Sequence, residues 1–332
     1  RHPLHRRAGP VADPSDRDVS PIVADALRAG YAGSGTVTTH SFAVMGTRAN
    51  IVLVGGTEAM TVELESLVRE LEALWTRFSR DSDIQRLNWS EGEPTEVSPL
   101  TVTLVMEMLA AQSLTGGDYD PTILPRLIAE GYDTSRVDNA RVTLLPDSAT
   151  WPVDVSSTVI SGTTISLPKG ATLDPGGVGK GLAADILAAH ALTLGALGAL
   201  IEIGGDVRII GTSPDNSRWR VCIEDPHEPT RHCAVVNLVN GAVATSSLLK
   251  RTWKKDSKDR HHLIDPSTGL PIQSEIVAVS VVAVSASIAE VVAKSGFIRP
   301  DFLTWAPTLG TAALRMFRDG SLAETANWKD YS

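Results

Sequence analysis

The segment LDPGGVGKGLAADIL, residues 173–187, brings together residue types that proteins use to bind phosphate groups. Four glycines lie at the start of an expected helix, and Lys180 stands among them. Glycine lets the backbone approach an anion closely, a helix N-terminus presents unpaired N–H groups, and lysine adds a positive charge. The segment predicts an anion-binding loop, with a glycine-rich turn and a solvated lysine as the simpler alternative.

Two well-known phosphate-binding patterns do not fit this loop. The dinucleotide pattern G-x-G-x-x-G begins at Gly177 and Gly179, but Leu182 occupies the position of its last glycine. The P-loop pattern needs a serine or threonine after its lysine to bind magnesium, whereas Gly181 follows Lys180. What remains is the physical basis of both patterns, which is close backbone approach, helix N–H groups and one cation.

A second segment, HLIDPSTG at residues 262–269, offers an imidazole and a carboxylate within one turn-forming stretch. A neutral imidazole can take a proton from a hydroxyl, so His262 is a candidate general base, with Asp265 as its neighbouring carboxylate. Taken alone, the segment is equally well explained as a turn that contains a histidine by chance.

These segments belong to an ordered series along the chain. The series comprises MGT at 45–47, DSDIQRLN at 81–88, GGDYDPT at 116–122, IGGDVRIIG at 203–211, AVATSS at 242–247 and HLIDPSTG at 262–269. In this order, and over about residues 41–318, the chain resembles the ApbE family of FAD:protein FMN transferases, called thiamine-biosynthesis lipoproteins in older usage.

The resemblance implies an activity and a set of partners. Members of the family bind FAD and, with a divalent metal that is usually Mg²⁺, transfer its FMN half to a serine or threonine of a flavin-acceptor protein. AMP is released, and some members also hydrolyse FAD to FMN and AMP. The expected function is therefore FMN transfer. An FAD-binding or redox protein without transfer activity and an FAD pyrophosphatase are the alternatives.

The resemblance also implies site residues. The loop at 174–181 corresponds to the family's pyrophosphate cradle, and His262 to its catalytic histidine, with Lys180 and Asp265 as further catalytic candidates. Phe78 stands where a tyrosine is common, which keeps ring stacking but loses a hydroxyl. The expected FAD contacts are Met45, Phe78, Tyr119, Asp120, Pro121, Asp174, Gly176, Gly177, Lys180 and Ile264.

The chain departs from the family in ASIAEVVAKSGF, the segment expected to form its last helix. The family typically has an aspartate and, four residues later, a threonine that bind the metal together with a carbonyl of the glycine loop. Glu290 and Lys294 stand at these positions, and Gly177 would supply the carbonyl. An ammonium only donates hydrogen bonds and cannot ligate a metal. Either Lys294 reaches the glycine loop as a permanent charge that replaces part of the metal, or the pair is an ordinary helical salt bridge. The third alternative is a metal held by Glu290, the Gly177 carbonyl, FAD phosphate oxygens and water, because Mg²⁺ commonly keeps water and substrate phosphates as ligands.

The hydrophobic pattern predicts the elements that position these residues. Apolar residues at helical spacing from Met60 to Phe78 predict a first helix. Further helices are expected at 99–113, 180–194 and 287–297. Strands are expected within 40–54 and at 199–203, 207–211, 219–224, 233–239 and 276–284. Hairpins mixed with helices indicate an α+β fold, not a doubly wound parallel sheet. The resemblance adds a single large domain with a T-fold-like core over residues 36–332.

Composition limits the other possibilities. The chain has 332 residues, 42% of them hydrophobic, and a formal charge of −9 from 30 basic and 39 acidic residues, which disfavours nucleic acid as a partner. No apolar run approaches the roughly 20 residues of a membrane span. Residues 1–35 are expected to form a loose leader. The compartment, cell envelope or cytoplasm, stays open. Symmetric pairing of strands 219–224 and 231–238 would place Cys222 and Cys233 nearly opposite, either as a cross-strand disulfide or as two reduced cysteines.

Overall fold

A computed structural model of the chain describes residues 36–135 and 137–332. The expected leader, residues 1–35, lies outside the described residues. The helices are α2 (Glu58–Trp75), α3 (Asp83–Asn88), α4 (Pro99–Thr115), α5 (Leu124–Ala129), α6 (Gly179–Thr193), α7 (Ala286–Ile298) and α8 (Phe302–Trp305), with 3₁₀ turns at Pro175–Gly177, Ala306–Leu309 and Trp328–Asp330. No helix of these described ranges is long and apolar enough to cross a bilayer.

The strands form one large sheet and several small ones. The large sheet has the order β1-β2-β6-β7-β10-β15-β16-β17, and each pair in it is antiparallel. The strands of the large sheet are β1 (Val37–Val44), β2 (Thr47–Val54), β6 (Gly198–Ile203), β7 (Asp206–Gly211), β10 (Gly241–Ser247), β15 (Ile276–Ala283), β16 (Ala312–Phe317) and β17 (Leu322–Glu324). The small sheets contain β3 (Thr95–Glu96), β4 (Val159–Ser161), β5 (Thr164–Ser166), β8 (Trp219–Glu224), β9 (His232–Leu238), β11 (Thr252–Lys255), β12 (Lys258–His261), β13 (Ile264–Asp265) and β14 (Leu270–Pro271). The prediction of an α+β fold without a doubly wound parallel sheet is confirmed.

Strand β2 shows why the large sheet lies between two apolar layers. Ile51 and Leu53 belong to the larger core cluster, whereas Val52 and Val54 belong to a second cluster. All four residues are at most 3% exposed. Successive side chains of a strand point to opposite faces, so an unbroken apolar run requires cover on both faces.

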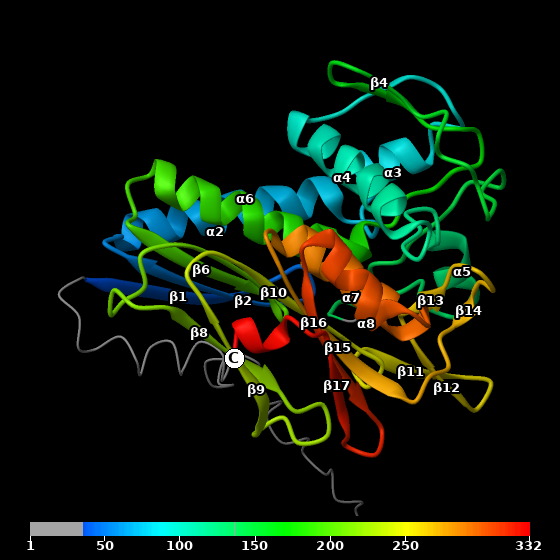
Figure 1. Cartoon of the computed structure of the whole chain (residues 1–332). Coiled ribbons are helices and arrows are strands. Elements are labelled where there is room, and N and C mark those ends of the chain that lie inside the picture. Colours follow the sequence, from blue (N-terminus) through cyan, green and yellow to red (C-terminus); the bar gives the residue numbers. More distant parts are fainter. Residues whose placement is uncertain (1–35, 136) are drawn as a thin grey trace, which may run out of the picture.

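Helices cover one face of the sheet and a hairpin covers the other. Helix α6 packs on β6 and β7, and α7 packs on β10 and β15 (Figure 1). The hairpin β8–β9 covers the opposite face through Trp219, Val221 and Val236. Helices α6 and α7 also touch each other, and a Cβ on Gly181 would lie 2.5 Å from the Ala286 carbonyl oxygen. A glycine at 181 is therefore needed for this close approach, which sets the glycine loop against α7.

Several expected elements differ from the prediction in detail. Helix α2 ends at Trp75 because Thr76 adopts an extended backbone with ψ 130°, so Phe78 lies beyond the helix instead of on its apolar face. Helix α4 ends at Gly116 in the left-handed conformation, as predicted. The helix at 286–298 is not the last one, since α8 follows it.

The cysteines of the β8–β9 hairpin are not bonded to each other. The register places Val235 opposite Cys222, and a bulge follows at Ile223. The expectation that Cys222 and Cys233 lie nearly opposite was wrong, because the strands do not pair symmetrically about the turn. No disulfide joins the two residues.

Candidate active site

A cavity of about 250 Å³ lies where the end of α2, the loop after α4, the glycine loop and the segment 262–266 meet. Of the residues expected from the sequence, its lining includes Met45, Phe78, Tyr119, Asp120, Asp174, Gly176, Gly177, Lys180, His262, Ile264 and Lys294. The fold thus brings together residues from Met45 to Lys294, which are far apart in the sequence. Pro121, Asp265 and Glu290 are not among the lining residues.

Met45 reaches the cavity from the turn between β1 and β2. Met45 and Gly46 have positive φ values of 51° and 66°, the pattern of a tight two-residue hairpin turn. A left-handed methionine is unusual, and its N–H donates to Glu72 Oε1 at 2.8 Å, which fixes the turn to α2. The MGT segment therefore places Met45 at the cavity through turn geometry.

The loop after α4 contributes Tyr119 and Asp120. The Asp120 carboxylate accepts hydrogen bonds from Thr122 N–H at 2.8 Å and from Trp151 Nε1 at 2.7 Å, so it holds the loop together. Tyr119 is 5% exposed, and its hydroxyl has no hydrogen-bond partner in the described structure. Burial, with the nearby Asp174 charge, raises its pKa well above the usual 10. The Tyr119 ring is therefore neutral.

The first half of the glycine loop is held by an arginine. Arg77 Nε lies 3.3 Å from Asp174 Oδ1, and its guanidinium also donates to the Tyr132 carbonyl at 2.8 Å. Burial raises the pKa of Asp174, while the Arg77 charge opposes that shift. The guanidinium also lies over the Phe78 ring, 4.3 Å from its centroid. Arg77 connects the end of α2 to the start of the glycine loop.

The second half of the loop leads into four charged residues, called here the ionic cluster: the buried Asp206 and Glu290, and the mostly buried Lys180 and Lys294. Lys180 Nζ bonds to Asp206 and lies 2.6 Å from Glu290 Oε1. Glu290 Oε2 accepts the N–H of Gly181 at 2.9 Å. Lys294 Nζ donates to the Gly177 carbonyl at 2.8 Å and to the Glu290 carbonyl at 3.0 Å. The cluster ties the glycine loop, α6, β7 and α7 together.

The ionic cluster shifts the pKa values of its members. Burial and the charge of Glu290 raise the pKa of Asp206 to about 6, against the opposing pull of Lys180. Burial alone would raise the pKa of Glu290, but the charges of Lys180 and Lys294 outweigh it and lower the value. For Lys180 burial works against the charged form, yet the two carboxylates raise its pKa.

His262 stands at the cavity with an unengaged ring nitrogen. Its Nδ1 is buried and has no hydrogen-bond partner in the part of the chain that the structure describes. Burial, together with the charges of Arg251, Lys294 and Lys180, lowers the pKa of His262 well below 6.5. The imidazole is therefore neutral near pH 7 and can accept a proton.

The comparison with known proteins agrees with this geometry. The sequence matches the model of the ApbE family over residues 45–313. The chain belongs to the ApbE family. It is 28% identical over 251 residues to the FAD:protein FMN transferase of Vibrio cholerae, which covers 71% of this chain and 74% of that protein. It is 27% identical over 267 residues to the FAD:protein FMN transferase of Escherichia coli K12, at 75% coverage of each chain.

Solved structures share the ApbE fold. The ApbE protein of Thermotoga maritima superimposes with a TM-score of 0.77 at 23% identity, covering 89% of this chain and 99% of that one. The flavin transferase ApbE of Vibrio cholerae superimposes with a TM-score of 0.73 at 24% identity, covering 90% and 100%. The expected fold of an ApbE-like single domain is confirmed.

Two of the expected site residues, Asp265 and Pro121, do not line the cavity and instead hold neighbouring backbone segments together. Asp265 Oδ1 accepts the N–H and the hydroxyl of Ser267 at 2.8 and 2.7 Å, which makes Asp265 part of the turn and not a partner of His262. The Pro121 carbonyl accepts a hydrogen bond from the Asp174 N–H at 2.9 Å, which anchors the start of the glycine loop. Neither residue enters the catalytic scheme proposed below.

Sequence patterns did not predict several residues that line the cavity or contact its lysines. Arg77 and Arg251 line the cavity but belong to no recognisable spacing, and Arg251 has a positive φ of 54° that no sequence rule indicates. Asp206 lies in the IGGDVRIIG segment, but the sequence of this segment does not indicate its contact with Lys180. The signal that could have identified Asp206 is its place directly after the Gly204–Gly205 turn, as the first residue of β7.

The residues present do not fit the metal site that the family resemblance implies. The Gly177 carbonyl, expected to bind the metal, accepts a hydrogen bond from Lys294, which confirms that this lysine reaches the glycine loop. Both carboxylate oxygens of Glu290 are engaged by Lys180 and by Gly181 N–H. Within residues 36–135 and 137–332 no group of three or more His, Cys, Asp or Glu residues is arranged to hold a metal. The Lys294 ammonium therefore contacts the Gly177 carbonyl, which the family resemblance implies as a ligand of the metal ion.

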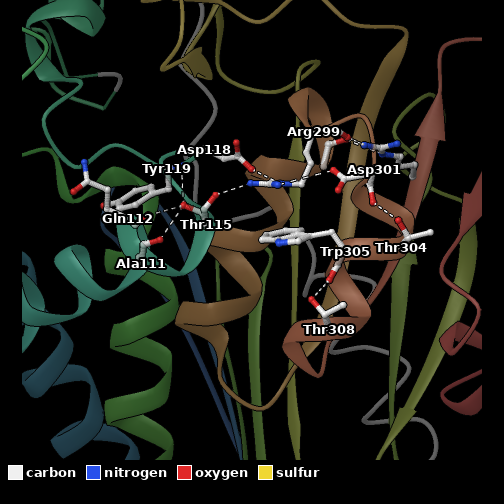
Figure 2. Close-up of polar contacts among 12 residues, drawn as sticks. Ala111, Gln112, Thr115, Asp118, Tyr119, Arg299, Asp301, Thr304, Trp305 and Thr308 are labelled. Carbon is white, nitrogen blue, oxygen red and sulfur yellow. Dashed lines mark hydrogen bonds and ion pairs between the residues drawn. The ribbon is translucent and has the colours of Figure 1, made fainter.

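Arg299 holds the Tyr119 loop to the end of α7. Figure 2 shows the side chain of Arg299, the residue that follows α7, reaching to Asp118, with the Trp305 ring beside it. Arg299 Nε donates to Asp118 Oδ2 at 2.7 Å, and Nη2 donates to the Thr115 carbonyl at 2.8 Å. The guanidinium lies 4.2 Å from the centroid of the Trp305 ring. Asp118 lines the cavity, so Arg299 positions the loop that shapes one wall.

Replacing Arg299 with alanine is expected to lower the free energy of unfolding by about 1 to 3 kcal/mol, because two charge-assisted hydrogen bonds and a cation–π contact are lost from a partly exposed site. Urea denaturation measures the change. Arg318→Ala is the matched control, since the Arg318 side chain is 57% exposed and lies 3.9 Å from Glu275. Equal losses in the two variants would contradict the positioning role of Arg299.

Proposed function

We propose that this chain is an FAD:protein FMN transferase that moves the FMN half of FAD to a serine or threonine hydroxyl of an acceptor protein and releases AMP. The observation that carries the proposal is the shared cavity of the neutral His262 ring, the glycine loop and the two lysines, in a chain of the ApbE family. Relatives with the same family fold bear this enzyme name.

The chemistry requires a base and a cationic environment, and the chain supplies both. His262 takes the proton of the acceptor hydroxyl as its oxygen attacks the phosphorus on the FMN side of the pyrophosphate. A new P–O bond forms, the bridging P–O bond breaks, and AMP leaves with the bridging oxygen. The phosphate of the leaving AMP gains negative charge. Lys180 and Lys294, which line the cavity, stabilise this charge.

Product analysis tests the proposal against its alternatives. The protein is incubated with FAD, with and without a flavin-acceptor domain, and FMN, AMP and flavinylated acceptor are separated by chromatography. Transfer predicts AMP and flavinylated acceptor together, and neither product without acceptor. Equal FMN and AMP without acceptor would identify a pyrophosphatase. Unchanged bound FAD in both reactions would identify a binding or redox protein.

The low pKa of His262 predicts an unusual pH profile. Burial and the nearby cations keep the ring neutral well below pH 6.5, so kcat/KM is expected to stay level from pH 8 through 6.5 and to fall only at lower pH. The lowered pKa of His262 also stabilises the folded state above pH 6.5. This contribution to the free energy of unfolding is lost as pH falls toward the lowered pKa. A pH–rate profile measures this, and a half-maximal rate near pH 6.5 would contradict it.

A further inference from the structure

Lys294 lies where the glycine loop and α7 come closest. Its Nζ is 2.8 Å from the Gly177 carbonyl oxygen, 3.0 Å from the Glu290 carbonyl oxygen and 3.6 Å from Glu290 Oε1. Three oxygens thus surround an ammonium that carries three protons. Carbonyl and carboxylate oxygens are also the ligands that hard divalent cations prefer. The ammonium therefore occupies an oxygen environment suited to a cation.

Gly177 allows the loop to close around this lysine. A Cβ on residue 177 would lie 3.2 Å from Lys294 Cε and 2.6 Å from Tyr119 Cε2. A side chain at 177 would displace one or both of these groups. The glycine loop is therefore fitted to Lys294 on one side and to the Tyr119 ring on the other.

The charges of the ionic cluster are balanced without a metal. When all four residues are ionised, Lys180 and Lys294 offset Asp206 and Glu290. The two carboxylate residues are buried, at 3% and 2% exposure, and each is paired with a lysine. A divalent ion on the Gly177 carbonyl would lie beside the Lys294 ammonium, with no unpaired carboxylate of the cluster to offset the repulsion.

We propose that the Lys294 ammonium replaces the divalent cation in this chain, so that the protein binds no metal at this site and transfers FMN without one. The inference rests on the proposed transfer reaction. Lys294 and Gly177 both line the cavity, so the ammonium lies at the wall of the space in which the pyrophosphate oxygens would lie. It stabilises the charge on the departing AMP oxygen as the bridging P–O bond breaks, while His262 holds the proton of the attacking hydroxyl.

Metal titration tests the site without reference to activity. Mn²⁺ is titrated by calorimetry into the chelator-treated full chain, alone and with FAD bound. We expect no one-to-one binding to the unmodified protein in the micromolar range, and a gain of such a site in the double variant Glu290→Asp with Lys294→Thr. One-to-one Mn²⁺ binding to the unmodified protein that Glu290→Gln removes would overturn the inference.

The rate of transfer in chelator gives the second test and needs no variant. We expect the rate of FMN transfer in EDTA to stay within about twofold of the rate in Mg²⁺. A loss of about tenfold or more in EDTA that Mg²⁺ restores would overturn the inference. If transfer is absent with and without Mg²⁺, the proposed function fails, and the Mn²⁺ titration still decides the metal question.

The lysine variants separate a catalytic charge from a structural one. Lys294→Met is expected to slow transfer by roughly 10²-fold, the scale of losing one electrostatic stabiliser. The double variant with aspartate and threonine is expected to recover rate only when Mg²⁺ is present. Lys169→Met is the control, because Lys169 is exposed and lies outside the cavity lining. Recovery in the double variant without Mg²⁺ would contradict the role of the ammonium charge.

Discussion

Replacing His262 with alanine is expected to slow FMN transfer by about 10²-fold to 10⁴-fold, the range for removal of a general base. The His262 ring lines the cavity and is held neutral by burial and by nearby cations, so the chain provides a proton acceptor there. Single-turnover kinetics with FAD and acceptor measure the loss, and calorimetry is expected to show that FAD still binds.

A distant histidine supplies the control for this experiment. His232 is exposed on β9, in the hairpin that covers the opposite face of the sheet, so His232→Ala is expected to transfer FMN at the rate of the unmodified protein. A His262→Ala rate within about threefold of the unmodified protein would remove the histidine from the catalytic scheme.

Replacing Lys180 with methionine is expected to lower the free energy of unfolding by about 3 to 5 kcal/mol, because removing one partner of a buried ion pair leaves the other uncompensated. Lys180 is bonded to both Asp206 and Glu290, whose side chains are 4% and 3% exposed. Without it the two carboxylates keep only the charge of Lys294. Denaturant unfolding monitored by tryptophan fluorescence measures the change.

The double variant Lys180→Met with Asp206→Asn provides the matched comparison. It removes one charge of each sign and restores the balance between Glu290 and Lys294, so its loss is expected to be smaller than that of Lys180→Met alone. A loss below about 1 kcal/mol for Lys180→Met, or a larger loss in the double variant, would show that the ionic cluster does not stabilise the fold as described.

The sequence predicted the fold class and most helices because their signals are local. The apolar spacing of α2, the glycine that ends α4 and the apolar run of β15 are each visible within one stretch of chain. The end of α2 was misplaced because Thr76 leaves the helix for a turn that presents Phe78 to the cavity. The helical spacing of the apolar residues does not show this change.

The site was predicted by resemblance more than by physical pattern. Lys180, His262 and the glycine loop could be named because their motifs are contiguous. Arg77 and Asp206 acquire their roles only through contacts with Asp174 and Lys180, which are far away in sequence. Asp265 lies in the same segment as His262, but the sequence does not show that its carboxylate holds a turn.

The departure at 290 and 294 could be seen in the sequence but not resolved there. A glutamate and a lysine four residues apart on a helix usually form a weak surface pair. Here the Glu290 side chain is buried and that of Lys294 is only 15% exposed, and the lysine reaches the Gly177 carbonyl because Gly181 allows α6 and α7 to approach closely. Burial and the glycine contact, both tertiary features, turn a common helical pair into part of the site.

The measurement that tests the central claim most directly is the intact mass of an acceptor domain after incubation with this protein and FAD. The account predicts an increase equal to FMN minus water on one serine or threonine of the acceptor, with one AMP released for each FMN attached, and an increase that forms about 10²-fold or more slower when His262 is replaced by alanine. An unchanged acceptor mass while FAD remains bound or is hydrolysed to FMN and AMP would contradict it.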